Sequence, residues 1–182
     1  MKNHGEPNTW DVTLVTDMSY LFINMKKFNA PIDQWNTSEV TNMAYMFRGA
    51  SSFNQPITID TSKVTKMNSM FSNASSFNQA ITMDTSQVTD MSYMFYGVNG
   101  FSSFNQPITM DTSQVTEMNC MFRYASSFNQ PITMDTSKVT DMNSMFMEAS
   151  SFNSPITMDT SKVYDMDYMF EGATAMTHPV PC

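Results

Sequence analysis

The sequence predicts an α/β repeat solenoid, with one parallel β-sheet along one side and short helical or 3-10 turns along the other. Three observations predict this fold. The motif V-T-x-M-x-x-M-F recurs from end to end. An I-T-M-D segment alternates apolar and polar residues, as a half-buried strand does. The M-x-x-M-F segment spaces its apolar residues in the way that a helix does.

The repeat sets the domain organisation of the 182-residue chain. The valines of the motif are Val15, Val40, Val64, Val88, Val115, Val139 and Val163. We therefore expect one domain over residues 1–182, with an N-terminal cap (1–14), six repeats (15–162), and a partial seventh repeat with a C-terminal cap (163–182). A single unit cannot bury its own apolar face, so successive units must stack.

The predicted strand is the I-T-M-D segment, residues 156–159 in the unit that begins at Val139. Pro155 precedes it, and proline suits the first residue of a strand because it lacks an N–H group. The D-T-S step that follows is typical of a turn, in which the aspartate accepts the backbone N–H two residues on. Each aspartate is therefore expected to cap its own turn.

The predicted helical turn lies in the Met-Phe part of the motif, because the preceding V-T pair favours β structure. The recurring Asn after the second Phe of each unit is expected to satisfy backbone groups of a neighbouring coil. A strand and a short helix in units of this length are typical of a leucine-rich-repeat-like solenoid.

The 21 methionines and 14 phenylalanines are explained by the repeat. Seventeen of the methionines and all phenylalanines except Phe101 stand at repeated positions. A methionine-rich Cu(I) site is the alternative, because thioethers are soft ligands. A stacked Met-Phe core is preferred, because Met fills irregular gaps and packs well against aromatic rings.

The segment V-T-D-M-S-Y-M-F-Y-G (residues 88–97), with S-S-F-N-Q-P-I and D-T-S-Q-V-T, resembles the repeat of BspA-like leucine-rich-repeat surface proteins. The resemblance covers almost the whole chain. It implies a leucine-rich-repeat variant that works at the cell surface or outside the cell, in attachment to host or matrix proteins. Many units of that family carry Trp before the D-T-S step, and here only Trp10 and Trp35 do.

Two ranks of outward strand positions are the candidate binding residues. They are Thr58, Thr82, Thr109, Thr133 and Thr157, and Asp60, Asp84, Asp111, Asp135 and Asp159, with Phe101 of the one long insertion as an added contact. We expect a non-catalytic module for protein binding or adhesion that presents these ranks and nearby tyrosines. The alternative is an ice-binding (antifreeze) or cation- and mineral-facing array, in which regular threonines match ordered water or carboxylates attract a divalent ion.

Composition excludes several other classes. A net charge of -8 with nine basic residues argues against nucleic-acid binding. No apolar run approaches the roughly 20 residues of a membrane span, so no membrane insertion is expected. Two Cys and two His give little basis for catalysis or a metal site, so we expect no enzyme and no cofactor, with calcium as a surface ligand at most. The partner and the oligomeric state stay open. No signal segment follows Met1, so either the protein is cytosolic or the sequence is a mature fragment or trimmed piece of a surface protein, as the resemblance implies.

Overall fold

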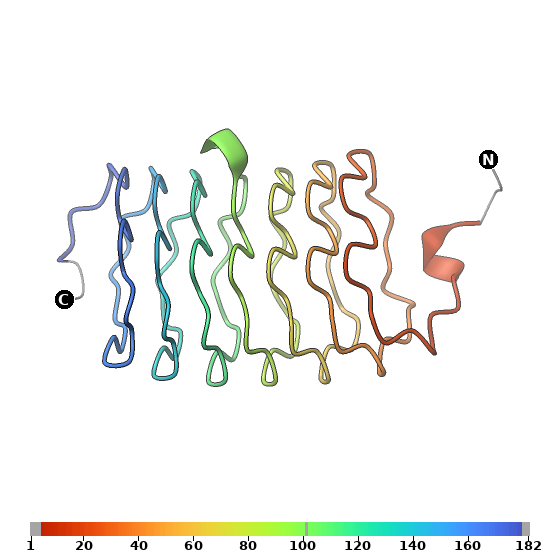
Figure 1. The fold of residues 1–182 in the computed structure, drawn as a ribbon. Coiled ribbons are helices and arrows are strands. Elements are labelled where there is room, and N and C mark those ends of the chain that lie inside the picture. Colours follow the sequence, from red (N-terminus) through yellow and green to blue (C-terminus); the bar gives the residue numbers. More distant parts are fainter. Residues whose placement is uncertain (1–4, 101, 180–182) are drawn as a thin grey trace.

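The computed structural model describes residues 5–100 and 102–179 and arranges them as a row of coils (Figure 1). The two described ends of the chain lie at opposite ends of the row. Among the described residues, the helices are two single 3-10 turns, η1 (Pro7–Thr9) and η2 (Val98–Gly100). The second of these turns belongs to the long insertion that the sequence marks.

The predicted α/β solenoid with a parallel β-sheet is wrong. The chain is 3% helical and 5% strand, and the described residues form no sheet. Isolated parallel bridges are the β pairing that they do form. Most of them join the residue after V-T in successive coils: Asp17, Asn42, Lys66, Asp90, Glu117, Asp141 and Asp165.

We call the first part of each coil the valine half (residues 64–76 and their equivalents). Its backbone N–H groups alternate between two kinds of hydrogen bond. Every second N–H donates to the next coil, as Ser69 N does to Ser92 O (2.8 Å) and Phe71 N to Met94 O (3.1 Å). The intervening N–H groups close tight turns within the coil, as Met70 N does to Met67 O (3.2 Å). An α-helix needs every amide to bond four residues back, so this pattern excludes the expected helical turn.

Residues with left-handed backbone conformations make this alternation of hydrogen bonds possible. The residue five positions after the repeat valine has a positive φ in every described coil: Tyr20, Tyr45, Ser69, Tyr93, Cys120, Ser144 and Tyr168. A non-glycine residue in this region costs roughly 1–2 kcal/mol, so the bonds between coils must offset that cost. The apolar spacing of the motif at i, i+3, i+6 and i+7 therefore reflects a series of tight turns and not a helix.

We call the second part of each coil the asparagine half (residues 77–87 and their equivalents). Hydrogen bonds of side chains are its main connections to the neighbouring coils. Asn78 N donates to Asn54 Oδ1 (3.0 Å), which confirms the role expected of the repeated Asn. Buried Thr85 donates its hydroxyl to the Asp111 carbonyl (2.9 Å). These side chains occupy backbone groups that a strand ladder would need, and in this half the described residues form one bridge, Ile132 to Ile156.

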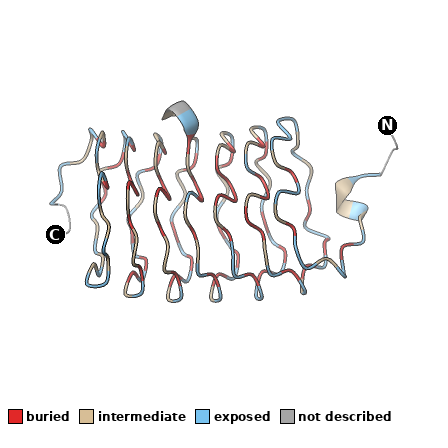
Figure 2. Ribbon diagram, viewed as in Figure 1, coloured by how far each residue is buried: buried red, intermediate tan, exposed pale blue. Residues whose placement is uncertain are grey.

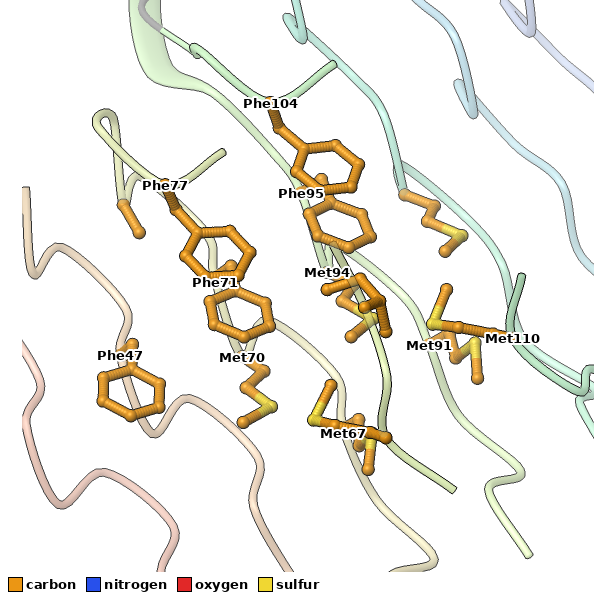
Figure 3. Packing of buried hydrophobic residues seen from close by; sticks show 14 of the residues in the cluster. Phe47, Met67, Met70, Phe71, Phe77, Met91, Met94, Phe95, Phe104 and Met110 are labelled. Atoms are coloured by element: carbon orange, nitrogen blue, oxygen red, sulfur yellow. The ribbon is translucent and has the colours of Figure 1, made fainter. Parts of the chain in front are cut away.

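The core is the predicted stack of Met and Phe layers (Figures 2 and 3). Within one coil the rings of Phe71 and Phe77 lie 3.9 Å apart, and Phe71 stacks on Phe95 of the next coil at 5.9 Å. The methionines beside them, such as Met67 and Met94, are fully buried. Burying one such side chain contributes about 1.5–3 kcal/mol to stability. Because Phe71 lies in the valine half and Phe77 in the asparagine half, the core also joins the two halves of the coil.

Residues 7–10 lie against the first coil. Trp10 stacks on Trp35 at 6.1 Å, and Trp35 Nε1 donates to Pro7 O (2.7 Å). At the other end, Thr177 N donates to Asn153 Oδ1 (2.7 Å), which continues the asparagine series.

Candidate functional site

The predicted Thr and Asp ranks are all exposed, as expected. They are Thr58, Thr82, Thr109, Thr133 and Thr157, and Asp60, Asp84, Asp111, Asp135 and Asp159. Two of the threonine hydroxyls are engaged, because Thr82 donates to Ile57 O (3.1 Å) and Thr109 to Ile81 O (3.3 Å). Phe101 lies outside the described residues. A binding role for the two ranks stays a prediction.

The aspartates of this rank cap their turns. Asp84 Oδ1 accepts the backbone N–H of Ser86 at 2.9 Å, and the same bond recurs at Asp60, Asp111, Asp135 and Asp159. The backbone and hydroxyl hydrogen bonds of Ser86 lower the pKa of Asp84 below its ordinary value, against the repulsion of neighbouring carboxylates. No group of three His, Cys, Asp or Glu residues within the described ranges is placed to hold a metal ion.

A second file runs along the valine half at the positive-φ position. We call it the tyrosine file: Tyr20, Tyr45, Ser69, Tyr93, Cys120, Ser144 and Tyr168. Tyr20 and Tyr168 are more than half exposed, and Tyr20 stacks on Tyr45 with ring centroids 4.7 Å apart and planes at 6°. The sequence predicted that tyrosines near the Thr and Asp ranks take part in binding, but not the surface that they build with their neighbours.

A slot interrupts the tyrosine file where Ser69 stands between Tyr45 and Tyr93. Its volume is about 270 Å³, and we call it the Tyr–Ser slot. It is lined by Tyr45, Arg48, Ser69, Ser72, Tyr93 and Tyr96. Ser69 and Ser72 are only 6% and 3% exposed. Neither hydroxyl has a hydrogen-bond partner among the residues that the structure describes.

The two walls of the slot are held differently. On one side, the Arg48 guanidinium lies 5.6 Å from the centre of the Tyr45 ring, within range of a cation–π interaction. On the other, a hydrogen bond with Cys120 raises the pKa of Tyr93 to about 12, and partial burial adds to that shift. Tyr93 is thus tied to the coil that follows it and stays a neutral phenol at physiological pH.

The arrangement can bind but offers little for catalysis. Hydroxyls, aromatic rings and one guanidinium meet at the slot, and no described His or carboxylate lines it. Sequence reasoning missed the slot because it arises where a small residue interrupts a file of large ones. The alternation of Tyr and Ser at one repeat position was the available signal.

Comparison with known families now adds a match over nearly the whole chain. Residues 2–109 and 81–181 match the family described as "Mycoplasma protein of unknown function, DUF285". The chain belongs to this family. BspA-like surface proteins carry DUF285 repeats, so the resemblance seen in the motif holds at the level of the repeat. Neither curated proteins nor solved structures gave a match. Among the described residues, no helix has the length and apolar character to span a membrane.

Proposed function

We propose that the chain is a non-catalytic binding module of a BspA-like surface protein, acting at the cell surface or outside the cell in adhesion to a protein or other surface ligand. One observation carries the proposal. Among the described residues, three of the four exposed tyrosines (Tyr20, Tyr93 and Tyr168) share a single repeat position above a core of Met and Phe that is buried in coil after coil. Tyrosine suits binding surfaces because it offers a large, rigid and amphipathic contact at a low entropic cost.

The DUF285 match supports the surface-protein part of the proposal, because BspA-like surface proteins carry this repeat. The exposed Thr and Asp ranks lie on the asparagine half and would form the alternative, polar contact surface. Their carboxylates already cap turns and some of their hydroxyls already bond carbonyls, which favours the tyrosine file as the main contact.

The test is adsorption of the pure chain to layers of fibronectin, collagen or mucin on a quartz-crystal microbalance. The decisive variant replaces Tyr20, Tyr45, Tyr93 and Tyr168 by Ser, the residue that Ser69 and Ser144 already place in the same conformation. We expect the wild-type chain to adsorb to at least one layer and the variant to lose about tenfold in affinity, or about 1.4 kcal/mol.

A matched control carries Thr109→Lys and Thr133→Lys on the asparagine half and should adsorb as the wild type does. Loss of adsorption in this control, with retention in the tyrosine variant, would transfer the contact to the Thr and Asp ranks. The ice-binding alternative is read in the same samples, because a freezing gap or shaped ice crystals would replace the adhesion proposal.

A further inference from the structure

We propose that the Tyr–Ser slot binds the ring of an acidic sugar, such as a uronic or sialic acid residue. This inference rests on the proposed binding function and names the ligand class of one site within the tyrosine file. It is carried by the shape of the slot, by the unpaired hydroxyls at its base and by the positive charge of Arg48 in its lining.

The slot has the dimensions of one missing ring. Tyr20 and Tyr45, on adjacent coils, already stack at 4.7 Å. Tyr45 and Tyr93 are two coils apart, which is roughly 9–10 Å at the spacing of neighbouring strands. A ring placed between them would lie roughly 4.5–5 Å from each tyrosine, within the range of stacked rings. Ser69 leaves that place open in the coil between the two walls.

The base of the slot favours a ring that carries hydroxyl groups. Ser69 and Ser72 are each more than nine-tenths buried and line the slot, and their hydroxyls have no partner among the described residues. A sugar can donate to and accept from such hydroxyls. A purely apolar ring would cover them without pairing them, and that carries a desolvation cost of roughly 1–3 kcal/mol per group.

The surrounding charge favours a ligand with a carboxylate. Two of the three coils that line the slot, in residues 41–50 and 65–74, contain Arg48 and Lys66 and no Asp or Glu, although the chain carries a net charge of -8. The third coil carries Asp90 three residues before Tyr93, but the charged residue that lines the slot itself is Arg48. A carboxylate on the ligand is therefore attracted to Arg48. Arginine binds carboxylates through two parallel hydrogen bonds.

A second serine in the tyrosine file provides an internal control. Ser144 stands between Cys120 and Tyr168, so only one of its neighbours is aromatic. The residues three positions on in the preceding coil, in its own coil and in the next are Arg123, Met147 and Glu171. This place therefore has an arginine where the slot has Arg48, but it has only one aromatic wall and a nearby carboxylate, so it should not take an acidic sugar.

The experiment is a titration of the full chain with glucuronic acid and N-acetylneuraminic acid, followed through the backbone amide resonances of Ser69 and Ser72. We expect saturable shifts with a Kd on the order of 1 mM. Glucose, which lacks the carboxylate, should bind at least about fivefold more weakly. Acetate and p-cresol, which supply the carboxylate or the aromatic ring alone, should give no saturable shift at these residues.

Two variants test the slot independently. Ser69→Tyr supplies the missing ring, in a conformation that Tyr45 and Tyr93 already adopt, and should abolish binding. Arg48→Gln keeps the stacking walls and should weaken the acidic sugars about fivefold or more while leaving glucose unchanged. Ser144→Tyr is the matched control and should bind as the wild type does. The dispersion of core amide resonances verifies the fold of each variant.

The inference is overturned if neither acid gives a saturable shift up to about 50 mM, or if Ser69→Tyr binds as tightly as the wild type. Equal losses in Ser69→Tyr and Ser144→Tyr would also overturn it. These outcomes are separable from failure of the proposed function. Tyrosine-dependent adsorption without sugar binding would contradict only the proposed ligand class. Sugar binding without adsorption to any layer would contradict only the proposed role in adhesion.

Discussion

The valine half and the asparagine half of each coil build the same stack by different means. In the valine half, backbone N–H groups donate to carbonyls of the next coil, so the bonds require no particular side chain. In the asparagine half, Asn and Thr side chains make the connections, as Asn105 Oδ1 does in accepting Asn129 N (2.9 Å). The outward positions of the first half can therefore vary, whereas the Asn and Thr positions of the second half cannot.

The variation of residues among the repeats matches this difference between the two halves. The position of Tyr93 is Tyr, Ser or Cys in different coils, whereas the position of Asn105 is Asn in all six full units. Variable residues above a backbone-bonded frame are the usual basis of a binding surface. This difference explains why the slot lies in the valine half, and four predictions test it.

The largest effect is expected from Asn105→Leu. Its side chain accepts both Asn129 N and Gln130 Nε2 (3.1 Å), and the substitution removes the acceptor of both donors. We expect a loss of about 2–3 kcal/mol in the free energy of unfolding, measured by urea denaturation. Asn105→Asp keeps the acceptor oxygen and should lose less than half as much. Equal losses in the two variants would mean that the hydrogen bonds are not the cause.

The threonines of one turn give the second test. Thr112 is buried and donates to Asp135 O at 2.9 Å, whereas Thr109, three residues earlier, is exposed. Thr112→Val should cost about 1–2 kcal/mol, because the carbonyl of Asp135 loses its partner. Thr109→Val should change the urea midpoint little. Similar midpoints for both variants would show that the buried threonine ladder does not join the coils.

The third prediction concerns backbone strain in the valine half. Glu148 is exposed with φ 59°, so Glu148→Gly should raise the free energy of unfolding by about 0.5–1 kcal/mol. Glu171, exposed in the next coil, is not among the positive-φ residues. Glu171→Gly should therefore lower stability by a similar amount, and thermal melts of the two variants should shift in opposite directions. A shift in the same direction for both would contradict the left-handed turns.

The smallest effect is a pH dependence of opposite sign in the two halves. Turn capping lowers the folded-state pKa of Asp84 and Asp111, so their contribution is present above the unfolded value of about 3.9 and is lost as pH falls through the lowered values. Burial and the neighbouring Asp141 and Asp90 raise the pKa of Glu117, so stability falls as pH rises through its folded-state value.

Urea midpoints measured between about pH 3 and pH 7 should therefore fall below about pH 4 in the wild type. Glu117→Gln should remove the small decline on the neutral side and leave the acid limb unchanged. An acid limb that persists after the five capping aspartates are replaced by Asn would assign it to other groups.

The sequence predicted the features that depend on residue type at a repeated position. The Met-Phe core, the exposed Thr and Asp ranks and the Asp-capped turns all follow from which side chain recurs where. The sheet and the helical turns were predicted wrongly, because apolar spacing alone does not separate a helical turn from alternating turns with left-handed residues. Nothing in the residue type of Tyr20 or Ser144 marks a positive φ.

The slot could not be predicted for a different reason. It depends on residues from three successive coils, Tyr45, Ser69 and Tyr93, and on the stacking distance between those coils. That distance becomes visible only when the coils are assembled. The same holds for the buried Thr112 ladder, whose members looked like ordinary turn residues in the sequence.

Amide hydrogen exchange at single-residue resolution distinguishes the bonding of the two halves of a coil. We expect strong protection, by a factor of about 10⁴ or more, for Met91, Tyr93 and Phe95, whose N–H groups donate to the next coil. The N–H groups of Ile108, Thr109 and Met110 have no partner among the described residues and should exchange within about a hundredfold of the unfolded rate. Strong protection of Ile108 or Met110 would restore a β-sheet on the asparagine half and contradict the division of the coil into two differently bonded halves.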